Sequence, residues 1–274
     1  MPNVPAVQLN DGHFIPQIGF GVWQVPDDVA VDACLTAFEA GYRHIDTAAL
    51  YENERGVGEA IAKSGIARDD LFITTKIWPT EYGFDDALRS FDTSMSKLGL
   101  DVLDLYLLHW QAPADGRFAE AWRALIQLKD EGRVRSIGVS NFHEERLRKI
   151  MDDSGVTPVI NQIELHPWLP QTRIRELDAA LGIVTESWSP LASGELVNDP
   201  TLAAIGEAHG KTAAQVMIRW HLQLGLVVLP KSVTPARIKE NIDVFDFTLS
   251  AQEMATIAGL ENGHRTGPDP DQFL

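Results

Sequence analysis

Cysteine is almost absent from this chain. The single cysteine among 274 residues, Cys34, leaves no partner for an intrachain disulfide and excludes a cysteine-rich metal site. Because Cys34 lies in the amphipathic stretch VDACLTAFEA, we expect it to be a small buried core residue and not a reactive thiol.

Long apolar runs are also missing. No run approaches the roughly 20 residues that a membrane-spanning helix needs. The first residues, MPNVPAVQLNDG, lack the basic flank and apolar block of a secretory signal peptide. We therefore expect a soluble cytoplasmic protein with no membrane partner, and its 45% hydrophobic residues can form a large core.

Positive charge is scarce. Lys and Arg number 23 against 39 Asp and Glu, which gives a formal net charge of −16. Such a field repels a polyphosphate backbone, so we expect no nucleic-acid partner. One small anionic cofactor is still compatible with this charge, provided that a local cluster of Lys and Arg offsets the field.

A metal centre is not indicated. Consecutive helical residues point in different directions, so His143, Glu144 and Glu145 cannot converge on one ion. His166 has no second histidine at metal-ligand spacing. We predict no metal site.

What the sequence does contain, from residue 28 onward, is a regular alternation of amphipathic helical stretches and short apolar runs. With the early run IGFGV there are eight such runs. The later seven end near Asp46, Lys76, His109, Ser140, Gln162, Trp188 and Pro230. Eight buried runs separated by helices predict an α/β fold, a (β/α)8 TIM barrel, and the lack of a Pro/Gly/Ser-rich linker predicts one domain over residues 1–274.

Three segments stand outside this alternation. Residues 6–17 predict an N-terminal β-hairpin that plugs the barrel floor, because the Asp-Gly pair within them favours a hairpin turn. Two helical stretches, 199–210 and 212–225, precede the eighth strand in place of one. A further helix is expected after Leu249, followed by the Pro/Gly-rich loop 263–274.

Proton-handling residues end three successive runs. Asp46 and Tyr51 belong to HIDTAALY, Lys76 ends LFITTK, and His109 ends LDLYLLH, so we expect them to meet at the carboxyl face of the barrel. A Tyr with a pKa near 10 is a poor acid at neutrality, so we expect Lys76 to lower the pKa of Tyr51 and Asp46 to keep Lys76 charged. With His109 orienting a carbonyl, this group suits a reduction in which hydride reaches carbon and Tyr51 protonates oxygen.

Each of these residues also has a purely structural interpretation. Asp46 could cap a turn, Tyr51 could be a packed aromatic, and His109 a satisfied buried histidine. Lys76 is harder to explain in this way, because an apolar strand rarely directs an unpaired lysine inward. A structural ion pair with Asp46 is its alternative.

Later strand ends carry groups suited to a nicotinamide. Ser140, Asn141 and Gln162 offer hydroxyl and amide groups for its carboxamide, although Asn141 could equally cap the following helix. Trp188 could stack on the ring or pack in the core.

A positive cluster follows the run GLVVLP. Lys231, Ser232 and Arg237 could bind an adenosine 2′-phosphate, which would favour NADPH over NADH, or could form a solvated surface. Residues 189–194 could bind a pyrophosphate through backbone N–H groups, or form a simple turn. No complete GxGxxG follows a strand, and we interpret the glycines of 56–58 as helix packing.

Several motifs in this order resemble the aldo-keto reductase family: GYRHIDTAALYENERGVGEAI, LFITTK, LDLYLLHW, RSIGVSNF, VINQIELHP and VLPKS. Through NQIELHP, ESWSPL and ENIDVFDF the chain is most similar to the bacterial branch that includes 2,5-diketo-D-gluconate reductases. The resemblance implies a monomeric oxidoreductase that reduces aldehydes, ketones or dicarbonyls, including keto-sugars, with NADPH.

The resemblance also implies residue roles. Asp46, Tyr51, Lys76 and His109 match the catalytic tetrad, with Tyr51 as general acid. The implied cofactor contacts are Gly21, Val22, Trp23, Asp46, Ser140, Asn141, Gln162, Trp188, Ser189, Pro190, Leu191, Ser193, Gly194, Lys231, Ser232, Val233, Arg237, Glu240 and Asn241. The implied substrate contacts are Trp23, Tyr51, Trp78, His109 and Trp110.

Two positions depart from the family pattern. Trp188 stands where many relatives carry Tyr, and Gln111 stands where relatives usually carry Pro, which we expect to loosen the loop and alter the pocket rim.

Two other functions remain open. A barrel aldolase would use Lys76 as a Schiff-base nucleophile, which requires a neutral lysine. The second function is that of a barrel that senses NADPH with little turnover, and the complete tetrad argues against it.

Overall fold

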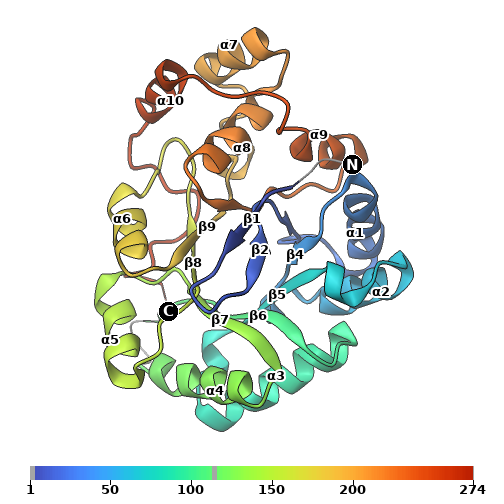
Figure 1. Cartoon of the computed structure of the whole chain (residues 1–274), viewed down its shortest axis with the longest axis vertical. Coiled ribbons are helices and arrows are strands. Elements are labelled where there is room, and N and C mark those ends of the chain that lie inside the picture. The colour runs from blue at the N-terminus through green and yellow to red at the C-terminus, as the bar shows by residue number, and fades with distance from the viewer. Residues whose placement is uncertain (1–3, 113–115, 274) are drawn as a thin grey trace.

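The computed structural model describes residues 4–112 and 116–273, in which eight parallel strands curl into a barrel (Figure 1). Each strand pairs with the next along the chain, and a parallel bridge between Ile18 and Val228 closes the sheet on itself. The strands are β3 (Phe20–Gly21), β4 (His44–Asp46), β5 (Phe72–Ile77), β6 (Leu103–Leu108), β7 (Val134–Ser140), β8 (Ile160–Glu164), β9 (Val184–Trp188) and β10 (Val227–Val228). The predicted (β/α)8 barrel is confirmed.

Amphipathic helices surround the barrel. Most of them pack their apolar faces on the outer side of the strands, whereas α7 packs on α8 and α10 packs on α7. They are α1 (Asp27–Ala40), α2 (Glu54–Ser64), α3 (Phe84–Leu98), α4 (Phe118–Asp130), α5 (Glu144–Ser154), α6 (Thr172–Ala180), α7 (Pro200–His209), α8 (Ala213–Gln223), α9 (Pro235–Ile242) and α10 (Ala251–Ala258). The extra helix before the last strand is confirmed. Capping boxes start α8 at Thr212 and α10 at Ser250. Among the described residues, no helix is both long and apolar enough to cross a membrane.

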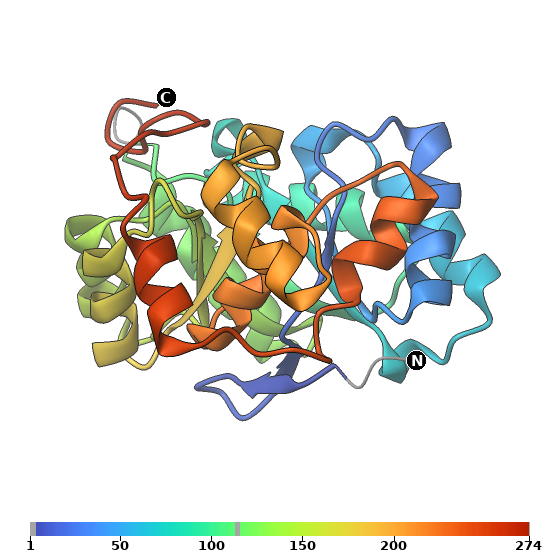
Figure 2. The same ribbon diagram turned by 90° about the horizontal axis from the view of Figure 1, so that it is seen from above.

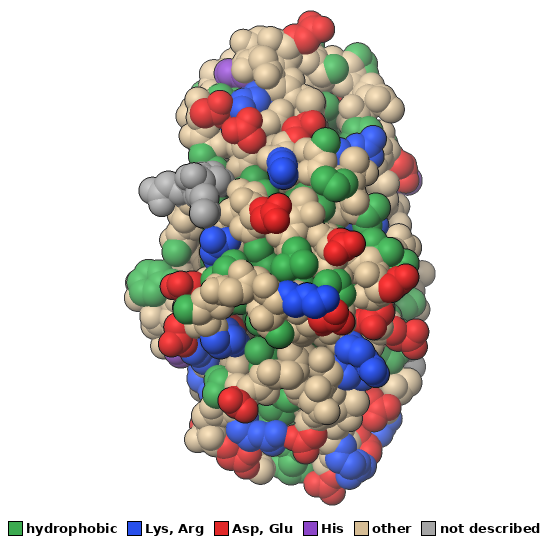
Figure 3. Space-filling view, turned by 90° about the vertical axis from the view of Figure 1, so that its right-hand side faces the viewer, with side chains coloured by type: hydrophobic (Ala, Val, Ile, Leu, Met, Phe, Trp, Pro, Cys, Tyr) green, Lys and Arg blue, Asp and Glu red, His purple; other side chains and the backbone are tan. Residues whose placement is uncertain are grey.

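The glycines of α2 serve helix packing, as the sequence predicts. A Cβ on Gly56 would lie 2.2 Å from the carbonyl oxygen of Asp27, and one on Gly58 would lie 2.4 Å from that of Leu98. Close approach of α2 to its neighbours therefore requires glycine. Cys34 is fully buried in α1, also as expected. On the side that carries α1, α2 and α9, Lys and Arg are interspersed with Asp and Glu (Figure 3).

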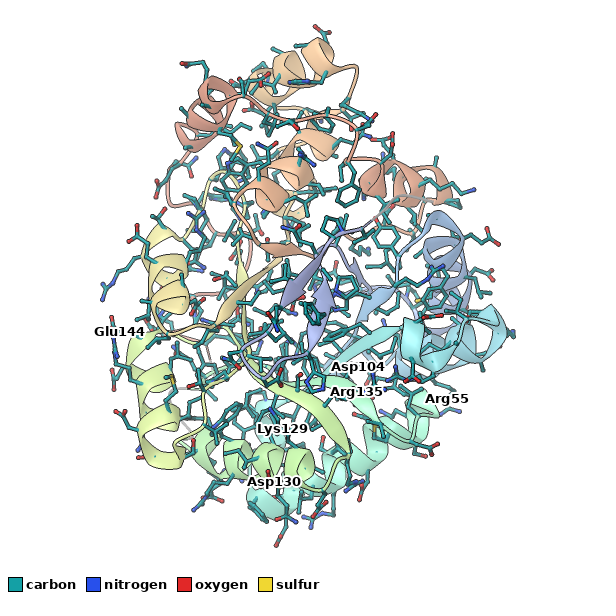
Figure 4. The ribbon with its side chains drawn as sticks, viewed as in Figure 1. Arg55, Asp104, Lys129, Asp130, Arg135 and Glu144 are labelled. Carbon is teal, nitrogen blue, oxygen red and sulfur yellow. The ribbon has the colours of Figure 1, made fainter. Side chains whose placement is uncertain are left out.

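The hairpin of β1 (Ala6–Gln8) and β2 (Phe14–Pro16) lies across one end of the barrel, and the C-terminal segment lies across the other (Figure 2). Leu9 and Ile15 pack against the inward-facing Phe72 and Leu105. The predicted plug of the barrel floor is confirmed. Near it, an ion pair of 3.2 Å joins Asp104 and Arg135 on adjacent strands (Figure 4).

Strand alternation decides what fills the barrel. Phe72 belongs to the apolar cluster inside the barrel floor, so Thr74 and Lys76, two and four residues later, also face inward. The interior thus changes from apolar at the hairpin end to polar at the carboxyl ends of the strands. This polar layer contains the residues that the sequence singled out.

Candidate active site

The structure brings the four proton-handling residues together at the carboxyl end of the barrel. The Lys76 ammonium donates to Asp46 Oδ1 at 2.6 Å and to the Thr47 carbonyl at 2.9 Å, and lies 3.4 Å from the Tyr51 hydroxyl. His109 directly follows β6, and its ring centroid is 5.6 Å from that of Tyr51. Asp46 therefore pairs with Lys76 and caps no turn.

Lys76 is completely buried, and its charge depends on its partners. Burial acts to lower its pKa, but the negative charge of Asp46 and further neighbours outweighs burial, so the pKa is raised above the ordinary value. Lys76 is therefore an ammonium ion. A neutral amine, which Schiff-base chemistry would need, is disfavoured.

The pKa of the Tyr51 hydroxyl is raised above its ordinary value. Burial raises the pKa of its hydroxyl, and the opposing effect of Lys76 does not fully compensate. Lys76 acts to lower this pKa, as the sequence predicts, but the net shift is upward. Its physical reason is that loss of water disfavours a phenolate more than an ammonium at 3.4 Å stabilises it. Tyr51 consequently holds its proton throughout the neutral range.

His109 is a neutral imidazole. Burial and the nearby charge of Lys76 together hold the pKa of His109 well below its ordinary value. Its Nδ1 has no hydrogen-bond partner within the described chain. A neutral ring offers one N–H donor, which is what orienting a carbonyl oxygen requires.

An amide cluster adjoins the four residues. Gln162 Nε2 donates to Asp46 Oδ2 at 2.9 Å. Asn141 Nδ2 donates to the His109 carbonyl and to Ser140 Oγ, both at 3.0 Å, while Asn141 Oδ1 accepts from the Trp188 indole at 2.8 Å. The next helix, α5, begins after His143, so Asn141 is not its cap. Gln162 lies two residues before the end of β8, and not at its end as predicted.

Aromatic side chains form the walls of the mouth. Trp23 is 46% exposed and packs on Tyr51 with ring centroids 4.8 Å apart, whereas Trp110 is buried. Trp78 lies against His109, and Trp110 against Trp188. Trp122 and Trp220 are buried in helix contacts, as their helical spacing predicts.

The C-terminal segment covers the mouth and supplies residues that the sequence did not single out. Phe273 packs on Trp110 with a centroid distance of 4.5 Å. Glu164 Oε1 accepts from the backbone N–H of Thr266 at 2.6 Å. A Cβ on Gly267 would lie 2.4 Å from the Trp188 ring, so only glycine allows the segment to approach this closely.

Gln111 ties this segment down. Its Nε2 donates to the Pro270 carbonyl at 2.9 Å and to Asp271 Oδ1 at 2.7 Å, and its Oε1 accepts from the His143 N–H at 3.1 Å. The expectation that Gln111 loosens the loop is therefore wrong, because its buried amide makes tertiary contacts that a proline could not make.

Replacing Gln111 by Ala should free the segment. Loss of the two hydrogen bonds to Pro270 and Asp271, each worth about 1 kcal/mol, should accelerate amide hydrogen exchange at residues 264–273 by roughly thirtyfold. Hydrogen exchange read by mass spectrometry measures this. Gln127→Ala removes an exposed helical amide and is the matched control. Equal exchange in both variants would show that Gln111 does not anchor the segment.

The remaining predicted contacts lie on the neighbouring loops. The backbone N–H groups of Gly21 and Val22 donate to Pro230 and Asp46, so they are already paired. Lys231, four residues before α9, and Arg237, in the first turn of α9, are exposed. The same region contains the buried or partly buried Ser232, Glu240 and Asn241 and the exposed Val233. Glu240 accepts from Thr212 at 2.7 Å.

Backbone strain is concentrated at this face. Every non-glycine residue with a positive φ in the described chain lies in a loop between a barrel strand and the helix after it. These residues are Gln24, Glu52, Ala112, Asn141, Gln171, Ser189, Ala192 and Ser193. Such conformations are costly and cluster where function demands a fixed backbone. The run 189–194, including Pro190, Leu191 and Gly194, contains three of the eight.

No group of three or more His, Cys, Asp or Glu side chains in residues 4–112 and 116–273 is arranged to hold a metal ion. The chemistry of the site is that of a buried ion pair, a phenol, a neutral imidazole and a cluster of amides. Such a set can donate a proton to an oxygen and can hold a flat amide-bearing ring.

Comparison with known proteins gives close relatives. A family model described as Aldo/keto reductase family matches residues 17–262. An aldo-keto reductase of Mycolicibacterium smegmatis is 54% identical over 269 residues, 98% of each chain. Methylglyoxal reductase DkgA of Escherichia coli is 49% identical over 278 residues, which cover 100% of this chain and 99% of that protein. The crystal structure of a Gox0644 mutant in complex with NADPH is 46% identical with a TM-score of 0.95, over 100% of both chains.

Proposed function

Because this chain belongs to the aldo/keto reductase family and is therefore an oxidoreductase, we propose that it uses NADPH to reduce aldehydes, ketones or dicarbonyls to alcohols. The observation that carries the proposal is the Tyr51 hydroxyl beside the buried Lys76–Asp46 ion pair, with the neutral His109 next to it. Small dicarbonyls and keto-sugars are the substrates we favour, since a relative that is 49% identical and almost fully covered is named a methylglyoxal reductase.

The chain's own donors fit NADPH. Near Tyr51, the side-chain oxygens of Asn141 and Gln162 can accept from a carboxamide N–H, since both amide nitrogens already donate within the protein, and Trp188 offers a flat ring. The exposed cations Lys231 and Arg237 form no ion pair within the described chain, and the N-terminus of α9 lies between them. We infer that these cations bind the 2′-phosphate and that the strained 189–194 loop binds the pyrophosphate.

When bound, NADPH supplies the hydride. The protein's part is the proton: Tyr51 donates it to the carbonyl oxygen as that oxygen gains negative charge. Lys76 stabilises the phenolate left on Tyr51, and Asp46 holds the ammonium in position. His109 donates a hydrogen bond that sets the angle of the carbonyl.

Two alternatives are less well supported. A Schiff-base aldolase needs a neutral Lys76, whereas Asp46 keeps this side chain charged. A sensor of NADPH needs no proton donor, whereas this site contains one in Tyr51.

The test of the proposed function is NADPH oxidation measured with a panel of aldehydes, dicarbonyls and keto-sugars. Turnover with any of them supports the reductase, and no turnover with all of them favours the sensor.

Arg237→Ala should weaken NADPH binding more than NADH binding. Loss of one charge-assisted contact to the 2′-phosphate costs about 1.5–3 kcal/mol, so the NADPH Kd should rise roughly 10- to 100-fold while the NADH Kd changes little. Fluorescence titration measures both constants. Lys239→Ala removes another exposed cation of α9 and is the matched control. Equal losses for both cofactors in Arg237→Ala would contradict the 2′-phosphate role.

We further expect a monomer of 30.3 kDa that works in the cytoplasm as one domain. The substrate-binding aromatics we propose are Trp23, Trp78 and Trp110, which lie around Tyr51 and His109.

A further inference from the structure

A second buried acid lies behind the ion pair and has no part in the mechanism above. Glu186, in β9, is completely buried, and alternation along the strand directs it inward with Trp188. Its Oε2 accepts from Gln162 Nε2 at 2.8 Å, and the same nitrogen donates to Asp46 Oδ2 at 2.9 Å. One amide group therefore bridges two carboxyl groups inside the barrel.

The surroundings of Glu186 offer too little positive charge for two carboxylates. Lys76 is the cation nearby, and its ammonium is already directed at Asp46 and Thr47. His44 Nε2 lies 3.9 Å from Glu186 Oε1, but burial and the charge of Lys76 lower the pKa of His44 to about 3, so the ring is neutral. The remaining titratable neighbour, Tyr51, keeps its proton.

Two carboxyl groups that share one site and one cation cannot both ionise at neutral pH. Burial, reinforced by the negative charge of Asp46, raises the pKa of Glu186 to about 8. Asp46 has the ammonium as its partner, whereas Glu186 Oε1 has no hydrogen-bond partner among the described residues. Glu186 is therefore the one that keeps its proton.

We propose that Glu186 is a positioning residue for the proton donor, one that supports reduction while protonated and opposes it once ionised. This inference rests on the proposed reductase function. Glu186 acts through two routes. Its Oε2 holds the Gln162 amide against Asp46, and its negative charge, when present, makes both Lys76 and Tyr51 less acidic. A less acidic Tyr51 donates its proton more slowly to the carbonyl oxygen.

The first test is the pH profile of kcat at saturating NADPH and carbonyl substrate. In the wild-type enzyme kcat should fall by roughly tenfold as pH rises through about 8, the size expected for one added charge at a few ångströms. Glu186→Gln keeps an acceptor for Gln162 and cannot ionise, so its profile should be flat there. Glu186→Met provides no acceptor for Gln162 and cannot ionise. Its kcat should therefore be lower at every pH, and its profile should show no alkaline fall.

A control separates this effect from general pH sensitivity. Asp178 is another buried acid whose pKa is raised, by burial, to about 7, but it accepts from Thr185 and Asn161. Asp178→Asn should leave the pH profile of kcat unchanged. An alkaline fall that persists in Glu186→Gln, or that disappears in Asp178→Asn, would overturn the proposal.

A second readout needs no turnover. Because the pKa of Glu186 is higher in the folded state, folding retains its proton, so its contribution to stability falls as pH rises from about 4.5 to about 8. The Tm of Glu186→Gln minus the Tm of the wild type should therefore increase across this range. A constant difference would refute the protonated state. If the wild type reduces no carbonyl at all, the proposed function fails, while this comparison still tests Glu186.

Discussion

Tyr51→Phe should abolish nearly all carbonyl reduction, with a fall in kcat of about a thousandfold. General acid catalysis contributes typically 10²–10⁴-fold, and Phe retains the ring that packs on Trp23 and His109 while removing the hydroxyl proton that Tyr51 donates. Stopped-flow or steady-state loss of NADPH absorbance measures the effect. The variant keeps the ring contacts of Tyr51 and loses only the hydroxyl that lies beside Lys76. We therefore expect the Kd for NADPH to change little.

Tyr42→Phe is the matched control. Tyr42 is completely buried, and its hydroxyl has no hydrogen-bond partner in the described chain, so its loss removes a phenol without touching the site. This variant should retain wild-type kcat. Turnover by Tyr51→Phe at the level of Tyr42→Phe would show that another group donates the proton.

The sequence predicted the barrel and the four proton-handling residues for the same physical reason. Parallel strands bring their carboxyl ends to one face, so Asp46, Lys76 and His109 could be grouped without knowing any loop. Short apolar runs between amphipathic helices are local patterns, which can be recognised from the sequence alone. The hairpin was equally visible, because its turn and its alternating residues lie within 12 positions.

Glu164 and Glu186 were missed although the signal was present. Glu164 ends β8 and Glu186 lies within β9, and each is a charged residue in an apolar strand, as Lys76 is. Both proved to be completely or almost completely buried. Gln162 was predicted to end its strand, two residues before Glu164, and Glu186 was passed over because it lies within a run and not at its end. An acid two positions before an inward strand end also faces inward, so strand alternation would have placed Glu186 beside the site.

Other features could not have been predicted from local patterns. Gln111 bonds to Pro270 across 159 positions, and no spacing rule connects two loops so distant in sequence. The pKa of Tyr51 depends on how much water is excluded around it, which is a property of the packed barrel. The charges of Asp46 and Lys76 beside the phenol were predicted, but the extent to which packing excludes water there was not.

Lys76→Met should destabilise the fold as well as remove activity. It leaves the buried Asp46 carboxylate without its ammonium, and breaking a buried ion pair in this way costs about 3–5 kcal/mol, or roughly 6–20 °C in Tm for a protein of this size. Thermal unfolding measures the loss. Reduction should also fall by at least the factor seen in Tyr51→Phe, because no cation remains to stabilise the phenolate.

The double variant Asp46→Asn with Lys76→Met separates these two consequences. Removing both charges leaves no unpaired ion in the barrel, so much of the lost Tm should return, while kcat should stay at the level of Lys76→Met. The single and double variants together show whether the ion pair serves the reaction or the fold. Recovery of kcat along with Tm would mean that Lys76 and Asp46 are structural and that Tyr51 works without them, whereas Tm recovered alone identifies the ammonium as part of the proton-donating machinery.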